Sequence, residues 1–284
     1  MDDRASSIPT RTIRCSRPRR GPSFNFRTLD GFEWNTVELG ISDLSPALEN
    51  LRLLHLSDLH LRHHWRRELD EVIRRTNEHP PDLILFTGDF VDDKRDHRPA
   101  VPILERFVRQ LKSRHGMYAT LGNHDGDLLA ARLPGMGVRV IIHQRVIVPM
   151  GGSAVELIGF PGPDRRDLNE DFVHALPARA AAVPRIILGH YPDLIRAAEV
   201  AGLAADLYLA GHTHGGQICL PNEFPIIRHD TLPRRLCKGA HDFRGTCLLV
   251  SRGLGFTTIP LRIFCPGEVI EIVLKRLTID PLSH

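Results

Sequence analysis

The stretch ADLYLAGHTHGGQ, residues 205–217, joins a short apolar run to two histidines that stand among glycines. An apolar run of this length that ends at Gly is typical of a buried β-strand. Imidazole is a common metal ligand, and the glycines beside His212 and His214 leave room for both rings to reach one small volume. The stretch therefore predicts a buried strand that leads directly into a metal-binding loop.

Four other segments repeat this form, in which an apolar run stops at Gly or Ser and polar residues follow. They are LRLLHLSD (51–58), DLILFTGD (82–89), MYATLGNHD (117–125) and RIILGH (185–190). Open α/β sheets bind ligands beyond the carboxyl ends of their strands. If the five strands are neighbours, their polar residues converge at one edge: Asp58, His60, Asp89, Asp92, Asn123, His124, Asp125, His190, His212 and His214.

The spacing within these segments favours a shared site. Residues i and i+2 of an extended chain point to the same side, so we expect Asp58 with His60, and His212 with His214, to act as pairs. Glycines are expected to let the backbone turn sharply beside a bound ion. They precede four of the polar residues, namely Asp89, Asn123, His190 and His212.

Helical patterns alternate with the predicted strands. The spacing of Leu69, Val72 and Ile73 predicts one helix, and the apolar residues within 101–111 predict another. Asp193 is expected to cap a third helix. The alternation of strand and helix predicts an α/β fold.

Further strands follow from three short apolar runs within residues 138–160, which polar or Gly-Gly breaks separate. They predict a β-meander, and TCLLVS (246–251) and EVIEIVLK (268–275) predict two more strands. Together with the alternating elements, these strands predict two packed sheets flanked by helices.

The charge of the chain is unevenly distributed. Residues 1–24 carry six arginines and two aspartates, a net +4, and the whole chain carries +3, so the remainder sums to −1. We therefore expect residues 1–24 to be a basic, disordered leader and residues 25–284 to be a single domain. The leader could hold the protein weakly to anionic lipid, whereas the neutral body disfavours nucleic acid as a partner.

The cysteines and the apolar runs exclude several other classes of protein. The five cysteines are scattered and form no CxxC, which disfavours a disulfide framework and a thiolate zinc site. No apolar run has the roughly 18 residues of a membrane-spanning helix, and no secretory signal is visible. We expect a cytoplasmic protein, peripheral to the inner face of the membrane if the leader binds lipid.

The motifs DLH, GDFVD, GNHD, GHYP and GHTH, in this order, resemble the signature of the calcineurin-like metallophosphoesterases: D-x-H, G-D-x-x-D, G-N-H-D/E, G-H and G-H-x-H. The resemblance runs from about residue 50 to 275. The extended forms LSDLHL, GHTHGGQI and SRGLG are similar to the YkuE/YaeI-type bacterial phosphodiesterase branch. The sequence departs from that branch in CPGEV (265–269), which lacks a proline before the glutamate, and in the absence of an amino-terminal membrane helix or export signal.

The resemblance implies a four-layer α-β-β-α sandwich of two mixed sheets and a site for two divalent metal ions. The first ion would be bound by Asp58, His60, Asp89 and His214, and the second by Asp89, Asn123, His190 and His212. Asp89 would bridge the two ions and offset part of their mutual repulsion. Oxygen and imidazole ligands suit Mn, Fe, Zn or Ni, with Mn favoured, and disfavour Ca.

The resemblance also implies the mechanism. A hydroxide that bridges the metals would attack phosphorus in line, and His124, beside Asn123, would protonate the leaving group as general acid. Asp125 is expected to orient the His124 ring and raise its pKa. Asp92 is expected to be structural. Substrate choice is expected to lie in residues 61–67 and 220–242, which carry Arg and His that could meet a phosphate.

These features predict a metal-dependent phosphodiesterase that acts on a small-molecule phosphodiester. The alternative is a UDP-2,3-diacylglucosamine-type pyrophosphohydrolase of lipid A precursor synthesis, whose substrate is a nucleotide-linked lipid. A DNA nuclease is disfavoured by the neutral body. A non-catalytic scaffold is disfavoured because every predicted ligand is present, and the oligomeric state is left open.

Overall fold

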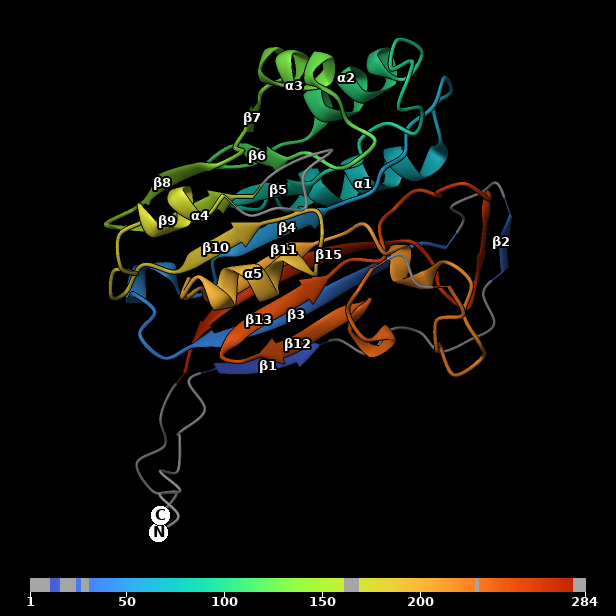
Figure 1. Cartoon of the computed structure of the whole chain (residues 1–284). Coiled ribbons are helices and arrows are strands. Elements are labelled where there is room, and N and C mark those ends of the chain that lie inside the picture. Colours follow the sequence, from blue (N-terminus) through green and yellow to red (C-terminus); the bar gives the residue numbers. More distant parts are fainter. Residues whose placement is uncertain (1–10, 16–23, 27–30, 161–168, 228–229, 278–284) are drawn as a thin grey trace.

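Two large β-sheets pack face to face in the computed structural model, which describes residues 11–15, 24–26, 31–160, 169–227 and 230–277 (Figure 1). The seven-stranded sheet has the order β1 (Arg11–Cys15), β3 (Glu33–Ile41), β15 (Glu268–Arg276), β4 (Arg52–Leu56), β5 (Leu83–Thr87), β6 (Met117–Thr120) and β7 (Val138–Val140). The six-stranded sheet has the order β12 (Gly239–Phe243), β13 (Thr246–Val250), β11 (Leu207–Ala210), β10 (Arg185–Leu188), β9 (Ser153–Gly159) and β8 (Gln144–Met150). A small separate sheet pairs β14 (Leu261–Ile263) with β2 (Phe24–Phe26).

Helices cover the outer face of each sheet. Along one side of the seven-stranded sheet lie α1 (Arg67–Glu78), α2 (Val101–Gln110) and α3 (Asp127–Arg132), whereas α4 (Glu170–His174) and α5 (Leu194–Val200) lie beside the six-stranded sheet (Figure 1). Among the described residues, no helix combines the length and the apolar character that a membrane span requires.

The central strands β5, β10 and β11 are almost wholly apolar because both of their faces are buried. On β5, Ile84 and Phe86 pack against the cluster that includes α1 and α2, whereas Leu83 and Leu85 pack into a second cluster between the sheets. A third cluster lies between the six-stranded sheet and α5. Three apolar clusters separating four layers confirm the expected α-β-β-α sandwich of two mixed sheets.

The predicted β-meander over residues 138–160 is wrong. Val138–Val140 forms β7, which pairs in parallel with β6 at the edge of the seven-stranded sheet. The chain then crosses to the other sheet, where β8 and β9 form an antiparallel hairpin. The meander fails because β7 finds its partner in an earlier strand rather than in the next one along the chain.

The structure changes two further expectations, one about the leader and one about a helix cap. Residues Arg11–Cys15, inside the predicted leader, form β1, which pairs antiparallel with β3. The third predicted helix does begin after Asp193, but the Asp193 side chain makes no capping hydrogen bond. Its Oδ2 accepts instead from Thr231 Oγ1 at 2.9 Å, so this carboxylate ties α5 to a distant loop. The limits of the leader and of the single domain stay predictions.

A buried ion pair fixes the loop SRGLG (251–255), which supports the strand end at Asp58. The backbone N–H of Leu254 donates to Ser57 O at 3.0 Å, and that of Gly255 donates to Asp58 O. Arg252 anchors the loop because its Nη2 donates to Glu268 Oε2 at 2.7 Å and its backbone N–H donates to Glu268 Oε1. Glu268 of CPGEV therefore has a structural role, although the residue directly before it is glycine and not proline.

We expect Glu268→Gln to lower the free energy of unfolding by about 3 kcal/mol, because the change leaves the buried Arg252 charge with Glu33 as its one remaining carboxylate partner among the described residues. Burial alone would raise the pKa of Glu268, but Arg252 and the N–H donors around the carboxylate lower it below 4.5. The stabilisation is therefore present above pH 4.5 and is lost as falling pH passes through the lowered pKa. Urea denaturation at several pH values measures both effects.

The matched control is Glu271→Gln on the same strand. Glu271 pairs with Arg52, whose side chain is 29% exposed, so we expect a loss of about 1 kcal/mol or less. Equal losses for the two variants would contradict the role of the Arg252–Glu268 pair.

Candidate metal centre

The polar strand ends converge at one edge, although they come from both sheets. β4, β5 and β6 pair in parallel in the seven-stranded sheet, and β10 and β11 pair in parallel in the six-stranded sheet. The packing of the sheets brings the two sets of ends together, so that the His212 backbone N–H donates to Asp58 Oδ1 at 3.1 Å. The five strands are therefore not neighbours in one sheet, and their ends converge because the two sheets pack together.

The backbone is strained where these side chains leave the strands. Asp58, His60, Asp89, His212 and His214 all have φ between 41° and 67°, in the left-handed region. Each such non-glycine residue costs of order 1–3 kcal/mol and persists only where its surroundings enforce the conformation. Strain at five residues in one small volume is typical of a functional site.

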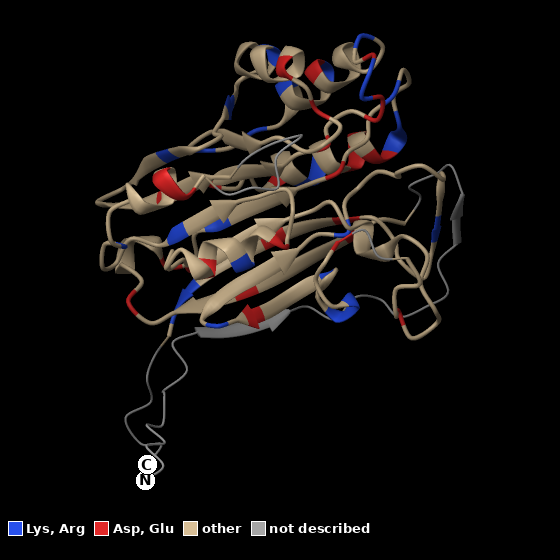
Figure 2. Cartoon of the chain, viewed as in Figure 1, with Lys and Arg blue, Asp and Glu red and all other residues tan. Residues whose placement is uncertain are grey.

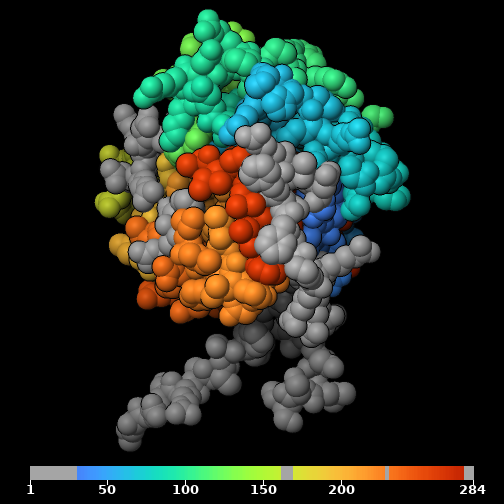
Figure 3. Space-filling model, turned by 90° about the vertical axis from the view of Figure 1, so that its right-hand side faces the viewer, coloured from blue at the N-terminus to red at the C-terminus, as the bar shows by residue number. Residues whose placement is uncertain are grey.

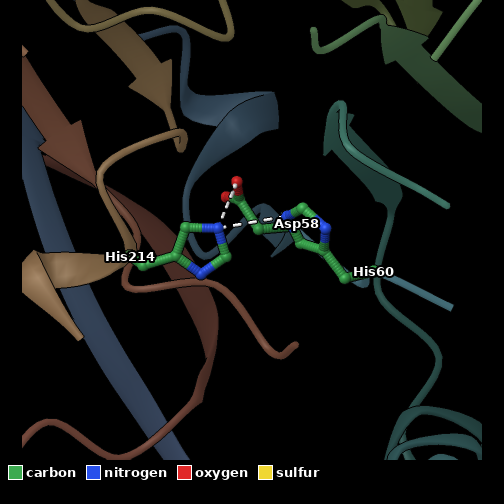
Figure 4. Close-up of side chains that lie close together, drawn as sticks. All are labelled: Asp58, His60 and His214. Carbon is green, nitrogen blue, oxygen red and sulfur yellow. Dashed lines mark hydrogen bonds and ion pairs between the residues drawn. The ribbon is translucent and has the colours of Figure 1, made fainter. Parts of the chain in front are cut away.

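The first group of donors contains Asp58, His60 and His214 (Figure 4). The Nε2 atoms of His60 and His214 face each other at 3.1 Å, and His214 Nε2 lies 3.4 Å from Asp58 Oδ1. All three side chains are buried. Facing nitrogen atoms beside a carboxylate are the arrangement expected around a shared cation.

The second group contains Asn123, His190 and His212. Asn123 Oδ1 lies 3.1 Å from His190 Nε2 and 3.0 Å from His212 Nδ1. His212 and His214 thus face different groups and do not act as a pair, whereas Asp58 and His60 do share the first group, although all four residues are left-handed. The left-handed backbone therefore does not decide which of these neighbours pair.

Asp89 lies between the two groups. Its Oδ2 is 3.4 Å from His60 Nε2 in the first group and 3.5 Å from His190 Nε2 in the second. The carboxylate is buried, and its Oδ1 accepts from the His124 backbone N–H at 2.7 Å. One side chain therefore offers oxygen to both groups.

Hydrogen bonds on the outer side of two rings fix which nitrogen atom faces inward. His190 Nδ1 lies 2.7 Å from Thr87 O, which can only accept, so Nδ1 carries the proton. His60 Nδ1 lies 3.2 Å from Asp92 Oδ1, which fixes this ring in the same way. The Nε2 lone pairs of both rings are left for a metal ion, as is usual for metal-binding histidines.

The electrostatics of the site favour positive charge at its centre. Burial opposes charge on His60 and His190, but Asp89 and neighbouring carboxylates raise the pKa of both rings to about 9, and a bound metal ion would take the place of the proton at Nε2. The pKa of His214 is lowered by burial and by the charges of His60 and Arg262, so this ring stays neutral. Buried carboxylates and imidazoles that attract cations in this way fit divalent metal ions of the Mn, Fe, Zn or Ni type.

The glycines serve the site by leaving space more than by turning the chain. Gly88, before Asp89, has φ +89° and does turn sharply as expected. Gly211, before His212, has no positive φ, but a Cβ on it would lie 2.0 Å from Ser57 Oγ and 2.2 Å from Asp58 Oδ2. Any side chain at residue 211 would therefore displace Asp58.

His124 and Asp125 lie at the site in different ways. His124 Nδ1 lies 2.6 Å from Asp92 O and donates to it, and its ring is 4.6 Å from that of His60. Asp125 does not orient this ring: its carboxylate accepts from the backbone N–H groups of Asp89, Phe90 and Gly122. The expected role of Asp125 is corrected accordingly, since the carboxylate holds the backbone that carries Asp89.

The sequence analysis does not identify Arg262, which lies against the ring of His214. This fully buried guanidinium donates to Gly253 O and Gly255 O and lies 3.3 Å from His214 Nδ1. No carboxylate pairs with it among the contacts of the described residues. In the sequence it stands in PLRIF, where nothing distinguishes it from a surface arginine, so no local signal could have found it.

A cavity of about 420 Å³ opens beside the first group of donors. His60 lines it together with Arg62, His64, Arg66, Phe256, Thr258 and Pro260. The stretch 61–67 therefore borders the site as expected. Trp65 packs instead against the core, with the Arg106 guanidinium 3.8 Å above its ring.

In the stretch 220–242, two of the basic residues contact neighbours within their own loop. Arg234 lies 5.9 Å from the Phe224 ring, and Lys238 Nζ donates to Glu223 O at 2.8 Å. Neither residue lines the cavity. The four described cysteines outside β1 are buried and form no disulfide with one another, which fits the expectation of a chain without a disulfide framework.

Comparisons with known proteins agree with this geometry. The family model described as calcineurin-like phosphoesterase matches residues 51–216. The metallophosphoesterase YkoQ of Bacillus subtilis is 30% identical to this chain, and the match covers 83% of this chain and 87% of YkoQ. The metallophosphoesterase YkuE of Bacillus subtilis is 32% identical, and the match covers 82% of each protein. Phosphodiesterase YaeI of Escherichia coli is 29% identical over 78% of this chain and 82% of its own length. The chain belongs to the calcineurin-like phosphoesterase family and is a metal-dependent phosphoester hydrolase.

Proposed function

We propose that this protein is a phosphodiesterase that works with two divalent metal ions. The observation that carries the proposal is the place of Asp89, whose Oδ2 lies 3.4 Å from a nitrogen of the first donor group and 3.5 Å from one of the second. A carboxylate shared in this way is the ligand that two neighbouring cations need, because it offsets their repulsion.

Seven residues would hold the ions. Asp58, His60, Asp89 and His214 would bind the first, and Asp89, Asn123, His190 and His212 would bind the second. Manganese is favoured, since the donors are oxygen and imidazole without thiolate. When bound, the two ions supply positive charge for the phosphate oxygens and lower the pKa of the water that attacks phosphorus.

His124 would protonate the leaving group. Its Nδ1–H donates to Asp92 O, which turns Nε2 toward the donor groups and away from the backbone. Burial lowers the pKa of this ring, so a proton held at Nε2 is released more readily than from an ordinary imidazolium. Asp92 also accepts from His60 and pairs with Arg62 at 2.8 Å, which places it between the proton donor and a metal ligand.

The cavity supports a small anionic phosphoester as substrate. Arg62, His64 and Arg66 supply donors for a phosphate beyond the scissile bond. Phe256 and Pro260, which also line the cavity, offer apolar surface. This combination also favours the second candidate, a pyrophosphohydrolase of the UDP-2,3-diacylglucosamine type. The cytoplasmic location expected from the sequence stays a prediction.

Metal removal tests the proposal. Exhaustive EDTA treatment should abolish hydrolysis of bis(p-nitrophenyl) phosphate, and added Mn²⁺ should restore it, because the attacking water is activated only when the ions are bound. Circular dichroism of the metal-free protein controls for unfolding. Assays of p-nitrophenyl phosphate and of a nucleotide pyrophosphate in parallel separate diester from monoester and pyrophosphate cleavage. Full activity after chelation would contradict the metal mechanism.

A further inference from the structure

Exposed apolar side chains gather at one end of the molecule. Among the described residues, eight large apolar side chains are exposed, and five of them belong to two loops near the cavity. We call these five residues the apolar tip: Leu220, Phe224, Ile226, Ile227 and Ile259.

The apolar tip is held by hydrogen bonds. Leu220 N donates to Phe224 O at 2.9 Å, and Ile226 N donates to Ile218 O at 3.0 Å, so residues 218–226 form a tight turn. Gln217 Nε2 donates to Ile259 O at 2.7 Å and joins the second loop to this turn. Figure 3 shows the orange and red segments that contain these loops side by side on one face of the molecule. Hydrogen bonds therefore hold in place the backbone that carries these apolar side chains.

The apolar tip adjoins the cavity. Thr258 and Pro260, the residues on either side of Ile259, line the cavity beside His60. The same loop thus forms a wall of the site and carries an aliphatic side chain to the surface. A surface that docked on the apolar tip would lie beside the opening through which substrate enters.

Arginine borders the apolar tip. Arg234 lies 5.9 Å from the Phe224 ring, and Arg62, which pairs with Asp92, lines the adjoining cavity with Arg66. Glu223 is the one acidic residue of the turn, and Lys238 Nζ lies 3.4 Å from its carboxylate. Figure 2 shows the loops at the right-hand end mostly in tan. The short helix η4 (Arg234–Leu236) carries two arginines. Apolar side chains bordered by arginine and lysine complement a surface that is apolar inside and negative outside.

We propose that the apolar tip docks this protein on an anionic lipid bilayer, with the cavity opening at the headgroups. The apolar side chains enter the boundary between headgroups and acyl chains, and the surrounding cations contact the negative headgroups. This surface goes beyond the proposed phosphodiesterase activity and does not depend on it. Where that activity holds, docking would bring lipid-borne phosphodiesters to the metal centre.

Vesicle co-sedimentation tests the docking surface. The full chain should bind vesicles made of equal parts phosphatidylglycerol and phosphatidylcholine, and should bind phosphatidylcholine vesicles more weakly. Phe224→Ser with Ile226→Ser should reduce partitioning by at least about tenfold, because the two half-exposed side chains together bury about as much apolar surface as one fully exposed side chain, which contributes about that factor or more. Arg234→Gln should reduce binding to the anionic vesicles by about fivefold, and added salt should weaken it further.

The matched control is Leu128→Ser with Val200→Ser. These side chains are 79% and 84% exposed on α3 and α5, outside the apolar tip, so this variant should bind like the wild type. Circular dichroism and hydrolysis of bis(p-nitrophenyl) phosphate without vesicles should be unchanged in every variant, which separates docking from catalysis.

Three results would overturn the proposal. The first is a wild-type chain that does not bind the anionic vesicles, and the second is equal binding by the tip variant and the control variant. The third is a chain that is dimeric in solution, ignores vesicles and becomes monomeric in the tip variant, because the surface would then join two copies.

Discussion

Asp89→Asn is expected to lower both the metal content of the purified protein and its kcat/KM for a phosphodiester. Asn keeps the shape of Asp but carries no charge, so the oxygen that faces both donor groups can no longer offset the repulsion between two cations. Metal ions supply several kcal/mol of transition-state stabilisation, and about 4 kcal/mol corresponds to about a thousandfold in rate. We therefore expect kcat/KM to fall by about a thousandfold or more.

Metal analysis by plasma mass spectrometry, beside initial rates at fixed Mn²⁺, measures both effects. Asp93→Asn is the matched control, since Asp93 is exposed in the neighbouring loop and accepts only from the backbone N–H groups of Arg95 and Asp96. Asp92→Asn should fall between the two, with about a 10–100-fold loss of metal affinity, because Asp92 orients a ligand without touching the ion. Two firmly bound ions in Asp89→Asn would contradict the shared carboxylate.

His124→Ala should leave both metal ions in place and slow turnover. A general acid contributes about 10²–10⁴-fold, and its contribution is largest when the leaving group is a poor one. We expect the full loss for an alkyl phosphodiester and a much smaller loss for bis(p-nitrophenyl) phosphate, whose p-nitrophenolate leaves without a proton. Rates for a series of diesters, plotted against the pKa of the leaving group, measure this dependence.

The same experiment distinguishes a proton donor from a ligand. His124 lies close enough to His60 and Asp89 to contribute to a metal site, so a loss of metal in His124→Ala would assign it as a ligand. His63→Ala provides the control, because His63 is exposed and does not line the cavity. A uniform loss of rate for all leaving groups, with metal retained, would also contradict the role of general acid.

The sequence predicts the strands that are buried on both faces, because such strands must be apolar and must end at polar residues or glycine. It does not predict which strand pairs with which. The apolar runs around Val138 and Val148 look alike, yet the first completes one sheet and the second begins the other. Pairing depends on packing between the layers, which no local pattern records.

The candidate site was predicted through its motifs, and the local geometry was not. The rule that residues i and i+2 share a side holds for Asp58 with His60 and fails for His212 with His214, although all four residues are left-handed. Asp125 stands next to His124 in sequence, but its carboxylate turns to three backbone N–H groups that only the fold brings near. Arg262 contacts His214, which lies 48 residues away in the sequence, and only the fold brings the two side chains together.

Anomalous diffraction from crystals grown with Mn²⁺ tests the central claim most directly. The account predicts two manganese peaks about 3.5–4 Å apart, with Asp89 bound to both, His60 and His214 at one ion and His190 and His212 at the other. A single peak, or two peaks that do not share Asp89, would contradict it.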